Sequence, residues 1–410
     1  MKLESFFLLL IIILTGTTYV ALFGSAINIL SILVLGLLFA QDLQFKIKKD
    51  LILTYLIITA FLVVLLIMHY FLVPYTNDPI PYMTFYTRCI LMGLFLVYLK
   101  SKNLELLGLL NPLLKIIALH AIVAFFLSFF VVNFLFNITT EKVYTNSFLY
   151  LFFYNSSFNL FGITFYRNQG IFWEPGILQV YMNILFFISS FIYKERRWQI
   201  VSVFLIFTTY STTGIGLLLI QLLYVIFSKS VSIFQRSIII IGVGIVTIPL
   251  FVLNYQSKMN DSDDAQSDVS SSILRVYDFL EGVDLTLSHP FTGVGLSEKS
   301  YQNVKNSRST ILSDYSQSFI DNIYDRRSSN SIMFFLSRFG VLFSFIWFYF
   351  LYKQKMVTTN RFLFFVIIIV SNFSEPLFMD PFFVLLVCTG LYESFHFTNT
   401  NSLLLPKYVK

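Results

Sequence analysis

The chain has 410 residues, of which 57% are hydrophobic and 12% are charged, and its mean hydropathy is +0.76. These values exclude an ordinary soluble domain and indicate a polytopic membrane protein. The net charge of +6 is explained by basic residues on the cytoplasmic side of a membrane, so it does not indicate a nucleic-acid partner. Cys89 and Cys388 lie in apolar runs without metal-ligand spacing, so neither a disulfide framework nor a metal site is predicted.

Apolar runs divide the chain into membrane spans. About twelve of them are long enough to cross roughly 30 Å of hydrocarbon, so we expect an all-α membrane protein with about twelve transmembrane helices. The predicted spans are residues 5–19, 22–40, 51–73, 84–99, 113–136, 175–193, 198–211, 213–228, 237–254, 331–352, 360–373 and 380–395. The predicted parts of the chain are transmembrane residues 1–136, an extracytoplasmic loop 137–174, transmembrane residues 175–254, a large extracytoplasmic loop 255–330, and transmembrane residues 331–410.

The distribution of Lys and Arg predicts the orientation. Basic residues are dense in alternate connections, for example at 46–49, 194–197 and 353–361, whereas the intervening short connections carry none. Because positive residues in short loops stay on the cytoplasmic side, both termini are expected in the cytoplasm. The first apolar run is expected to be retained as a helix, since no small-residue cleavage site precedes the next span.

The segment from Arg167 to Pro175 places charge and turn residues directly before an apolar run. Ionisable side chains at membrane depth are costly and often functional, which makes Arg167 and Glu174 the first candidates for chemistry. A guanidinium stays charged and matches the oxygens of a phosphate, so Arg167 suits a lipid diphosphate, with Trp173 close by for sugar stacking. Two other interpretations remain: Arg167 and Glu174 neutralise each other as an ion pair, or Glu174 and Pro175 simply begin a helix.

The connection 255–330 is 76 residues long and has seven basic and eleven acidic residues. A stripe of apolar residues at three- and four-residue intervals predicts an amphipathic helix whose apolar face docks onto the protein or the membrane surface. The residues of this stripe are Ile273, Tyr277, Leu280, Val283 and Leu287. The helix is expected to stop at Ser288-His289-Pro290, because proline disfavours a helical conformation in the residue that precedes it and cannot continue the helix. Arg275 lies on its polar flank.

Three other ionisable residues are candidates for a site. Arg338 is about 10 Å inside the tenth predicted span and either snorkels outward or faces an internal cavity. Arg88 lies nearer the outer end of the fourth predicted span, where snorkelling is easier. His289 is either a general base or a turn residue before Pro290.

Three short motifs, taken in order and with their predicted sidedness, resemble the O-antigen polymerase and O-antigen ligase superfamily of bacterial cell envelopes. They are 167–175 before a span, 211–214 at a tight outer turn, and Arg275 followed by 289–295 in a long outer loop. The resemblance covers residues 160–352 by motif and the remainder by topology.

This resemblance implies a GT-C-type membrane glycosyltransferase that uses no metal, cofactor or nucleotide sugar. Such enzymes transfer glycans between undecaprenyl diphosphate carriers on the outer face of the bacterial cytoplasmic membrane. Ligases of the superfamily usually have a His before the Asn that begins the span after the long loop, whereas this chain has Ser329 before Asn330. The missing His favours a Wzy-type polymerase of O-antigen or capsule repeat units, with the lipid-linked oligosaccharide and a chain-length regulator as partners.

In the mechanism that this resemblance suggests, Arg167 and Arg275 stabilise the diphosphate leaving group. Glu174 or His289 then accepts the proton of the acceptor hydroxyl. The other residues expected to contact diphosphate or glycan are Trp173, Asn330 and Arg338. The alternatives are an O-antigen ligase of the same superfamily and a flippase for the same lipid-linked unit, whose spans would be similar but which needs no 76-residue outer loop.

Overall fold

A computed structural model describes residues 2–41, 49–73, 78–139, 144–160, 163–228, 271–307 and 329–396. Within this part of the chain, six helices are both long enough and apolar enough to cross a membrane. The protein is therefore a mainly helical, multi-pass membrane protein, as the composition predicts. The ninth predicted span, 237–254, lies outside the described residues.

Each of the other predicted spans overlaps a helix. The long apolar helices are α2 (Thr18–Ala40), α3 (Lys49–Leu72), α4 (Ile80–Ser101), α5 (Leu106–Ser128), α6 (Pro175–Phe187) with its π-helical continuation η2 (Ile188–Ile192), and α13 (Ser331–Lys353). The shorter ones are α1 (Leu3–Ile13), α7 (Arg196–Thr208), α8 (Thr212–Ser228), α14 (Arg361–Ser374) and α15 (Pro381–Phe395). Every residue of α6 is buried, which makes it the central helix of the bundle.

The first predicted span, 5–19, is longer than the helix that forms there. α1 ends at Ile13, and Gly16 adopts a left-handed conformation with φ 87° that turns the chain toward α2. Two backbone contacts tie this turn to the candidate segment: Thr17 forms an isolated antiparallel bridge with Phe172, and the Trp173 N–H donates to the Gly16 carbonyl at 3.2 Å. The turn therefore supports the residues just before α6.

Residues 137–174 contain strands that the hydropathy pattern did not predict. A short 3-10 helix, η1 (Val132–Phe134), leads from α5 into a three-stranded antiparallel sheet of order β1-β2-β3 and a separate pair β4-β5. The strands are β1 (Phe136–Thr139), β2 (Tyr144–Phe148), β3 (Phe152–Tyr154), β4 (Ser157–Leu160) and β5 (Ile163–Tyr166). In the β4-β5 pair, Ser157 lies opposite Tyr166, so the hairpin delivers Arg167 to the edge of the bundle.

The large connection contains the predicted helix α10 (Ser271–Ser288), followed by α11 (Glu298–Ser307). α10 ends at Ser288, within the predicted stop at 288–290, and the predicted apolar stripe is buried only in part: Tyr277 is 6% exposed. Leu280 and Leu287 are 45% and 73% exposed, whereas Asp278 and Glu281 are 7% and 6% exposed. The docked face lies against α13, where a Cβ at Gly282 would come within 2.7 Å of the Met333 Cβ.

α13 is broken at Gly340, whose φ of 73° and ψ of 172° interrupt the helix. The segment after α10 fills the break: the N–H groups of Val294 and Gly295 donate to the carbonyls of Ser337 and Arg338 at 2.8 and 3.0 Å. These bonds satisfy carbonyl groups that the interrupted helix leaves without helical partners. The segment after α10 is thereby fixed to the membrane bundle.

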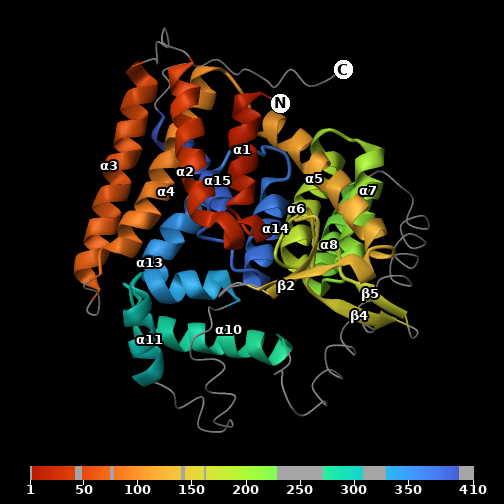
Figure 1. The fold of residues 1–410 in the computed structure, drawn as a ribbon. Helices are drawn as coiled ribbons and strands as arrows, with labels where there is room; N and C mark the ends of the chain where they lie inside the picture. The colour runs from red at the N-terminus through yellow and green to blue at the C-terminus, as the bar shows by residue number, and fades with distance from the viewer. Residues whose placement is uncertain are drawn as a thin grey trace.

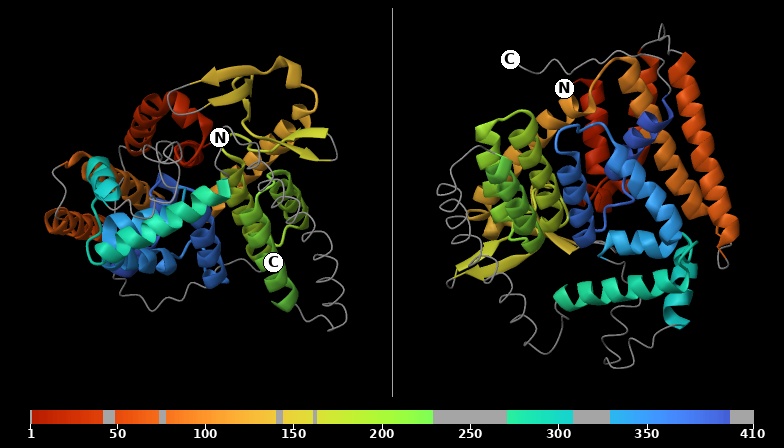
Figure 2. Two further views of the ribbon diagram at one scale, coloured as in Figure 1. Left: turned by 90° about the horizontal axis from the view of Figure 1, so that it is seen from below. Right: turned by 180° about the vertical axis from the view of Figure 1, so that it is seen from behind.

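The two ends of the molecule differ. Figures 1 and 2 show α10, α11 and the sheets together at one end, with α10 running across the ends of the bundle helices. The opposite end holds the start of α1, where Glu4 accepts from the Tyr98 hydroxyl at 3.4 Å, and an ion-pair cluster in which Lys100 and Lys355 contact Glu393 at 3.2 and 2.9 Å. Connections predicted to be cytoplasmic therefore meet at the end away from α10.

Candidate functional site

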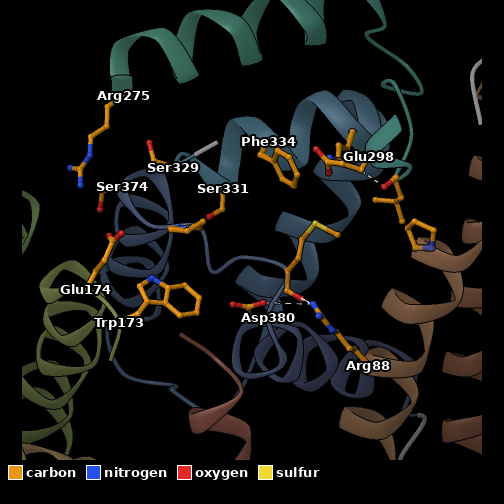
Figure 3. A pocket seen from close by; sticks show the side chains of 15 residues that line it. Arg88, Trp173, Glu174, Arg275, Glu298, Ser329, Ser331, Phe334, Ser374 and Asp380 are labelled. Atoms are coloured by element: carbon orange, nitrogen blue, oxygen red, sulfur yellow. Dashed lines mark hydrogen bonds and ion pairs between the residues drawn. The ribbon is translucent and has the colours of Figure 1, made fainter. Parts of the chain in front are cut away.

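Two adjoining cavities lie beneath α10. The smaller has a volume of about 260 Å³ and is lined by Asn155, Ser156, Arg167, Glu174, Pro175, Gly176, Ser211, Arg275 and Glu375. The larger has a volume of about 470 Å³, and its polar and aromatic walls include Arg88, Trp173, Glu174, Arg275, Glu298, Phe334, Arg338 and Asp380. Figure 3 shows the larger cavity, with Arg275 reaching down from α10. Glu174 and Arg275 belong to both walls.

Arg167 is fixed by the end of a neighbouring helix. Its Nε donates to the Thr209 carbonyl at 3.1 Å and a terminal nitrogen donates to the Tyr210 carbonyl at 3.4 Å, so the guanidinium caps the negative end of α7. A guanidinium has five N–H groups, which leaves others for a ligand. Among the described residues, Arg167 and Glu174 do not pair with each other within the 4.0 Å limit for an ion pair.

Burial lowers the pKa of Arg167 from its ordinary value, while the nearby carboxylates of Glu174 and Glu375 oppose this shift. Because an arginine side chain keeps its proton throughout the physiological range, the guanidinium remains a cation in the cavity. Arg275 lowers the pKa of Arg167 further, because it places a second positive charge nearby.

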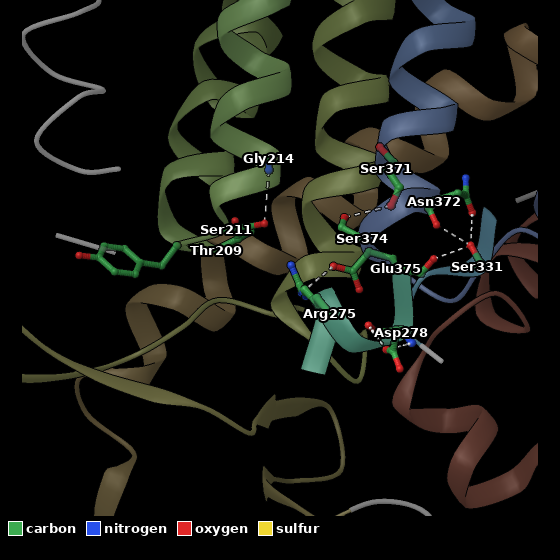
Figure 4. A network of polar contacts seen from close by, with 12 residues as sticks. Thr209, Ser211, Gly214, Arg275, Asp278, Ser331, Ser371, Asn372, Ser374 and Glu375 are labelled. Carbon is green, nitrogen blue, oxygen red and sulfur yellow. Dashed lines mark hydrogen bonds and ion pairs between the residues drawn. The ribbon is translucent and has the colours of Figure 1, made fainter. Parts of the chain in front are cut away.

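Arg275 faces a buried carboxylate. Its terminal nitrogen lies 3.9 Å from Oε1 of Glu375, and the side chains are 39% and 1% exposed (Figure 4). Glu375 fits because Gly176, in the first turn of α6, has no Cβ: one built there would overlap the Glu375 carboxylate. The smaller cavity thus brings together two arginines and two glutamates from separate parts of the chain.

Helix N-termini surround the cavities. Glu174 is the N-cap of α6 and Ser211 directly precedes α8, and both line the smaller cavity. Asp380 is the N-cap of α15 and Ser331 begins α13, and both line the larger one. Each helix N-terminus acts as roughly half a positive charge. This field offsets the carboxylates and favours an anionic ligand near Arg167.

The predicted tight turn at 211–214 lies slightly earlier, at 209–211, and residues 212–214 form the first turn of α8. Tyr210 takes a left-handed φ of 52°, and the Gly214 N–H donates to the Ser211 hydroxyl at 3.3 Å (Figure 4). Gly214 packs against α6, because a Cβ there would lie 2.8 Å from the Cβ of Gln179. The turn therefore holds the starts of α6 and α8 at the same cavity.

Arg338 faces an internal cavity and does not snorkel outward. The side chain is 3% exposed, donates to the Leu296 carbonyl at 2.6 Å and pairs with Glu298 at 2.5 Å. Its guanidinium also lies over the rings of Tyr301 and Phe334, at 4.6 and 4.2 Å from their centroids. These contacts attach α11 and the loop before it to α13.

Two predicted site residues lie elsewhere. Asn330 is the N-cap of α13, accepts from the Met333 N–H at 3.0 Å and is 3% exposed. His289 follows the last residue of α10, and its Nδ1 lies 2.8 Å from the Ser288 hydroxyl. Neither residue lines the two described cavities. Asn330 positions the helix start, and a role for His289 as a base stays a prediction.

Sequence reasoning missed Glu375 and Asp380. Both lie in the short connection after α14, and a Glu-Pro pair at 375–376 repeats the Glu-Pro pair at 174–175. Acidic residues at the ends of membrane spans were the available signal. Arg88, for which the sequence favours snorkelling, lines the larger cavity, where its guanidinium donates to the Met379 carbonyl at 3.1 Å and lies 3.6 Å from Asp380.

Comparisons of the chain with protein-family models, with curated proteins and with solved structures give no significant match.

Proposed function

We propose that the chain is a membrane glycosyltransferase of the polysaccharide polymerase type, acting on glycans carried by undecaprenyl diphosphate on the outer face of the bacterial cytoplasmic membrane. The observation that carries the proposal is the meeting of Arg167, from the end of a β-hairpin, and Arg275, from α10, in one cavity beside Glu174. Paired guanidinium groups next to helix N-termini suit a diphosphate.

The donor is the growing glycan, whose anomeric carbon is bonded to a diphosphate oxygen. A hydroxyl oxygen of the acceptor repeat unit attacks this carbon, and the bond to the diphosphate breaks. The bonding electron pair stays on the diphosphate, which leaves as undecaprenyl diphosphate. Arg167 and Arg275 stabilise the negative charge that develops on the leaving oxygen, in a cavity that is ready before the reaction.

The proton of the acceptor hydroxyl goes to a carboxylate. Glu174 is the better placed of the two in the smaller cavity, because it is exposed and also lines the larger one. Glu375 is buried and faces Arg275, which suits it to holding the guanidinium in place. Glu174 is therefore the proposed base and Glu375 the positioning residue.

A flippase is the second candidate, and the distribution of charge favours the transferase over it. Glu174 precedes α6, Glu375 follows α14 and Asp380 precedes α15, so these acids lie at helix ends. The described interior of α6 and α8 instead holds neutral amides, where Gln221 donates to Asn183 at 2.8 Å. A carrier for charged units would be better served by ionisable residues near the membrane midplane.

The test uses purified protein and the lipid-linked repeat unit extracted from cells that lack this chain. Wild-type protein should produce a ladder of polymers. Arg167→Ala and Arg275→Ala should each reduce the rate by roughly 10²-fold or more, because each removes a group that stabilises the transition state. Arg197→Ala is the matched control, since this exposed arginine lies in the first turn of α7, outside the lining of both cavities.

Wild-type rates for both cavity variants at normal protein levels would sink the mechanism. Deleting the gene separates the two candidate functions in cells. Loss of a polymerase leaves single repeat units attached outside, whereas loss of a flippase leaves none.

A further inference from the structure

We propose that the larger cavity is a glycan subsite, which binds the terminal sugar of the acceptor by stacking it on Trp173. The inference rests on the proposed function, in which the smaller cavity takes the diphosphate of the donor. The volume of the larger cavity, about 470 Å³, is within the usual range for sites that enclose a small organic ligand.

The two cavities share a wall. Glu174 and Arg275 line both cavities, so a sugar in the larger one and a diphosphate in the smaller one approach each other at these two residues. Transfer requires the acceptor hydroxyl to come within contact distance of the donor's anomeric carbon and of the base. The cavity next to the diphosphate must then hold sugar, with its reacting hydroxyl toward Glu174.

The walls of the larger cavity carry both guanidinium and carboxylate groups. All three arginines of the larger cavity have acidic partners. Arg88 lies 3.6 Å from Asp380, Arg338 pairs with Glu298, and Arg275 lies 3.9 Å from Glu375. A bound anion is therefore stabilised less by these paired arginines than by Arg167. Carboxylates that accept hydrogen bonds and guanidinium groups that donate them match a hydroxyl-rich, neutral ligand instead.

The larger cavity is also lined by two aromatic side chains, Trp173 and Phe334. Arg338 already covers Phe334, with its guanidinium carbon 4.2 Å from the ring centroid, so Trp173 supplies the indole face. Figure 3 shows the Trp173 ring between Glu174 and Asp380 in this view of the cavity. Backbone bonds hold the residue in place: its N–H donates to Gly16 at 3.2 Å and its carbonyl accepts from Asn155 at 3.4 Å.

The chain has three tryptophans, which allows a direct test. In the double variant Trp198→Phe and Trp347→Phe, Trp173 is the remaining indole fluorophore. The matched control retains Trp198 alone, because this residue lies in the first turn of α7, with the Lys115 ammonium over its ring, and lines neither cavity. Three probes are titrated into each protein: the native lipid-linked repeat unit, the free glycan released from it, and undecaprenyl diphosphate alone.

The Trp173 protein should respond to the repeat unit and to the free glycan with a saturable change in emission, and the Trp198 protein should not. Trp173→Ala in the wild-type background should weaken binding of the free glycan, measured by calorimetry, about tenfold, as expected when a central tryptophan is truncated. Trp173→Phe should retain most of the affinity, because it keeps an aromatic face.

Two outcomes overturn the subsite: no response of Trp173 to the glycan, or an equal response to undecaprenyl diphosphate alone. The polymer ladder of the wild-type protein is measured separately. A ladder without a Trp173 response rejects the glycan subsite and leaves the polymerase proposal standing. A Trp173 response without a ladder supports a glycan site and rejects the polymerase.

Discussion

One missing methyl group shapes the smaller cavity. Gly176 lies in the first turn of α6, where alanine would ordinarily be the better helix former. A Cβ at this position would overlap the carboxylate of Glu375, which is 1% exposed and 3.9 Å from Arg275. The glycine is therefore required by the packing of a charged group beside a helix start, and this requirement connects helix composition with the geometry of the two arginines.

We expect Gly176→Ala to displace Glu375 and to lower the rate of polymer formation on the order of 10²-fold, since small misplacements of reacting groups are this costly. The rate is measured with purified protein and lipid-linked repeat unit, alongside thermal unfolding in detergent. Gly216→Ala in α8 is the matched control, because a Cβ there meets nothing within 4 Å. Adding Glu375→Ala to Gly176→Ala removes the overlap and should restore thermal stability; an unfolding temperature that stays low would contradict this account.

At the scale of elements, α13 and the segment after α10 form one structural unit. The break at Gly340 leaves carbonyls of the first half of α13 to accept from Val294 and Gly295. A buried histidine of α3 completes the attachment: Nε2 of His69 lies 2.7 Å from the Thr292 carbonyl, and Nδ1 lies 3.0 Å from the Tyr82 hydroxyl. Because α10 is joined to this unit, the break also determines where Arg275 lies.

Gly340→Ala should destabilise the protein by about 1–3 kcal/mol through backbone strain alone, because φ near 73° with ψ near 172° is a conformation that essentially only glycine adopts. Steric overlap adds to this cost, since a Cβ would lie 2.5 Å from the Phe291 carbonyl carbon. Thermal unfolding of the purified variant measures the change. Gly36→Ala in α2, where a Cβ meets nothing within 4 Å, should be neutral or slightly stabilising; equal effects of the two substitutions would show that the break is not strained.

The whole molecule has ion-paired clusters at its two ends. The cavities with Arg167 and Arg275 lie beneath α10, whereas Lys100 and Lys355 meet Glu393 at the end near the start of α1. Both ends hold basic residues paired with acids, so the outward orientation of α10 stays a prediction from the distribution of Lys and Arg among the short connections.

Cysteine labelling checks this topology. In a variant with Cys89 and Cys388 replaced by serine, Asn303→Cys and Lys102→Cys place single thiols at exposed positions near the two ends. A membrane-impermeant maleimide should label Asn303→Cys in intact spheroplasts, and Lys102→Cys only after permeabilisation. The reverse pattern would invert the orientation and remove the outer-face site.

The sequence alone determined the membrane character, most helices and the stop of α10 within 288–290, because hydropathy and proline act locally along the chain. Only the tertiary structure decided which residues meet. The docked face of α10 carries Asp278 and Glu281 beside Tyr277 of the expected stripe, because Ser329 donates to Asp278 at 2.7 Å and Gly282 permits close contact with α13. The place of Glu375 opposite Arg275 likewise depends on packing between distant segments, which no local pattern records.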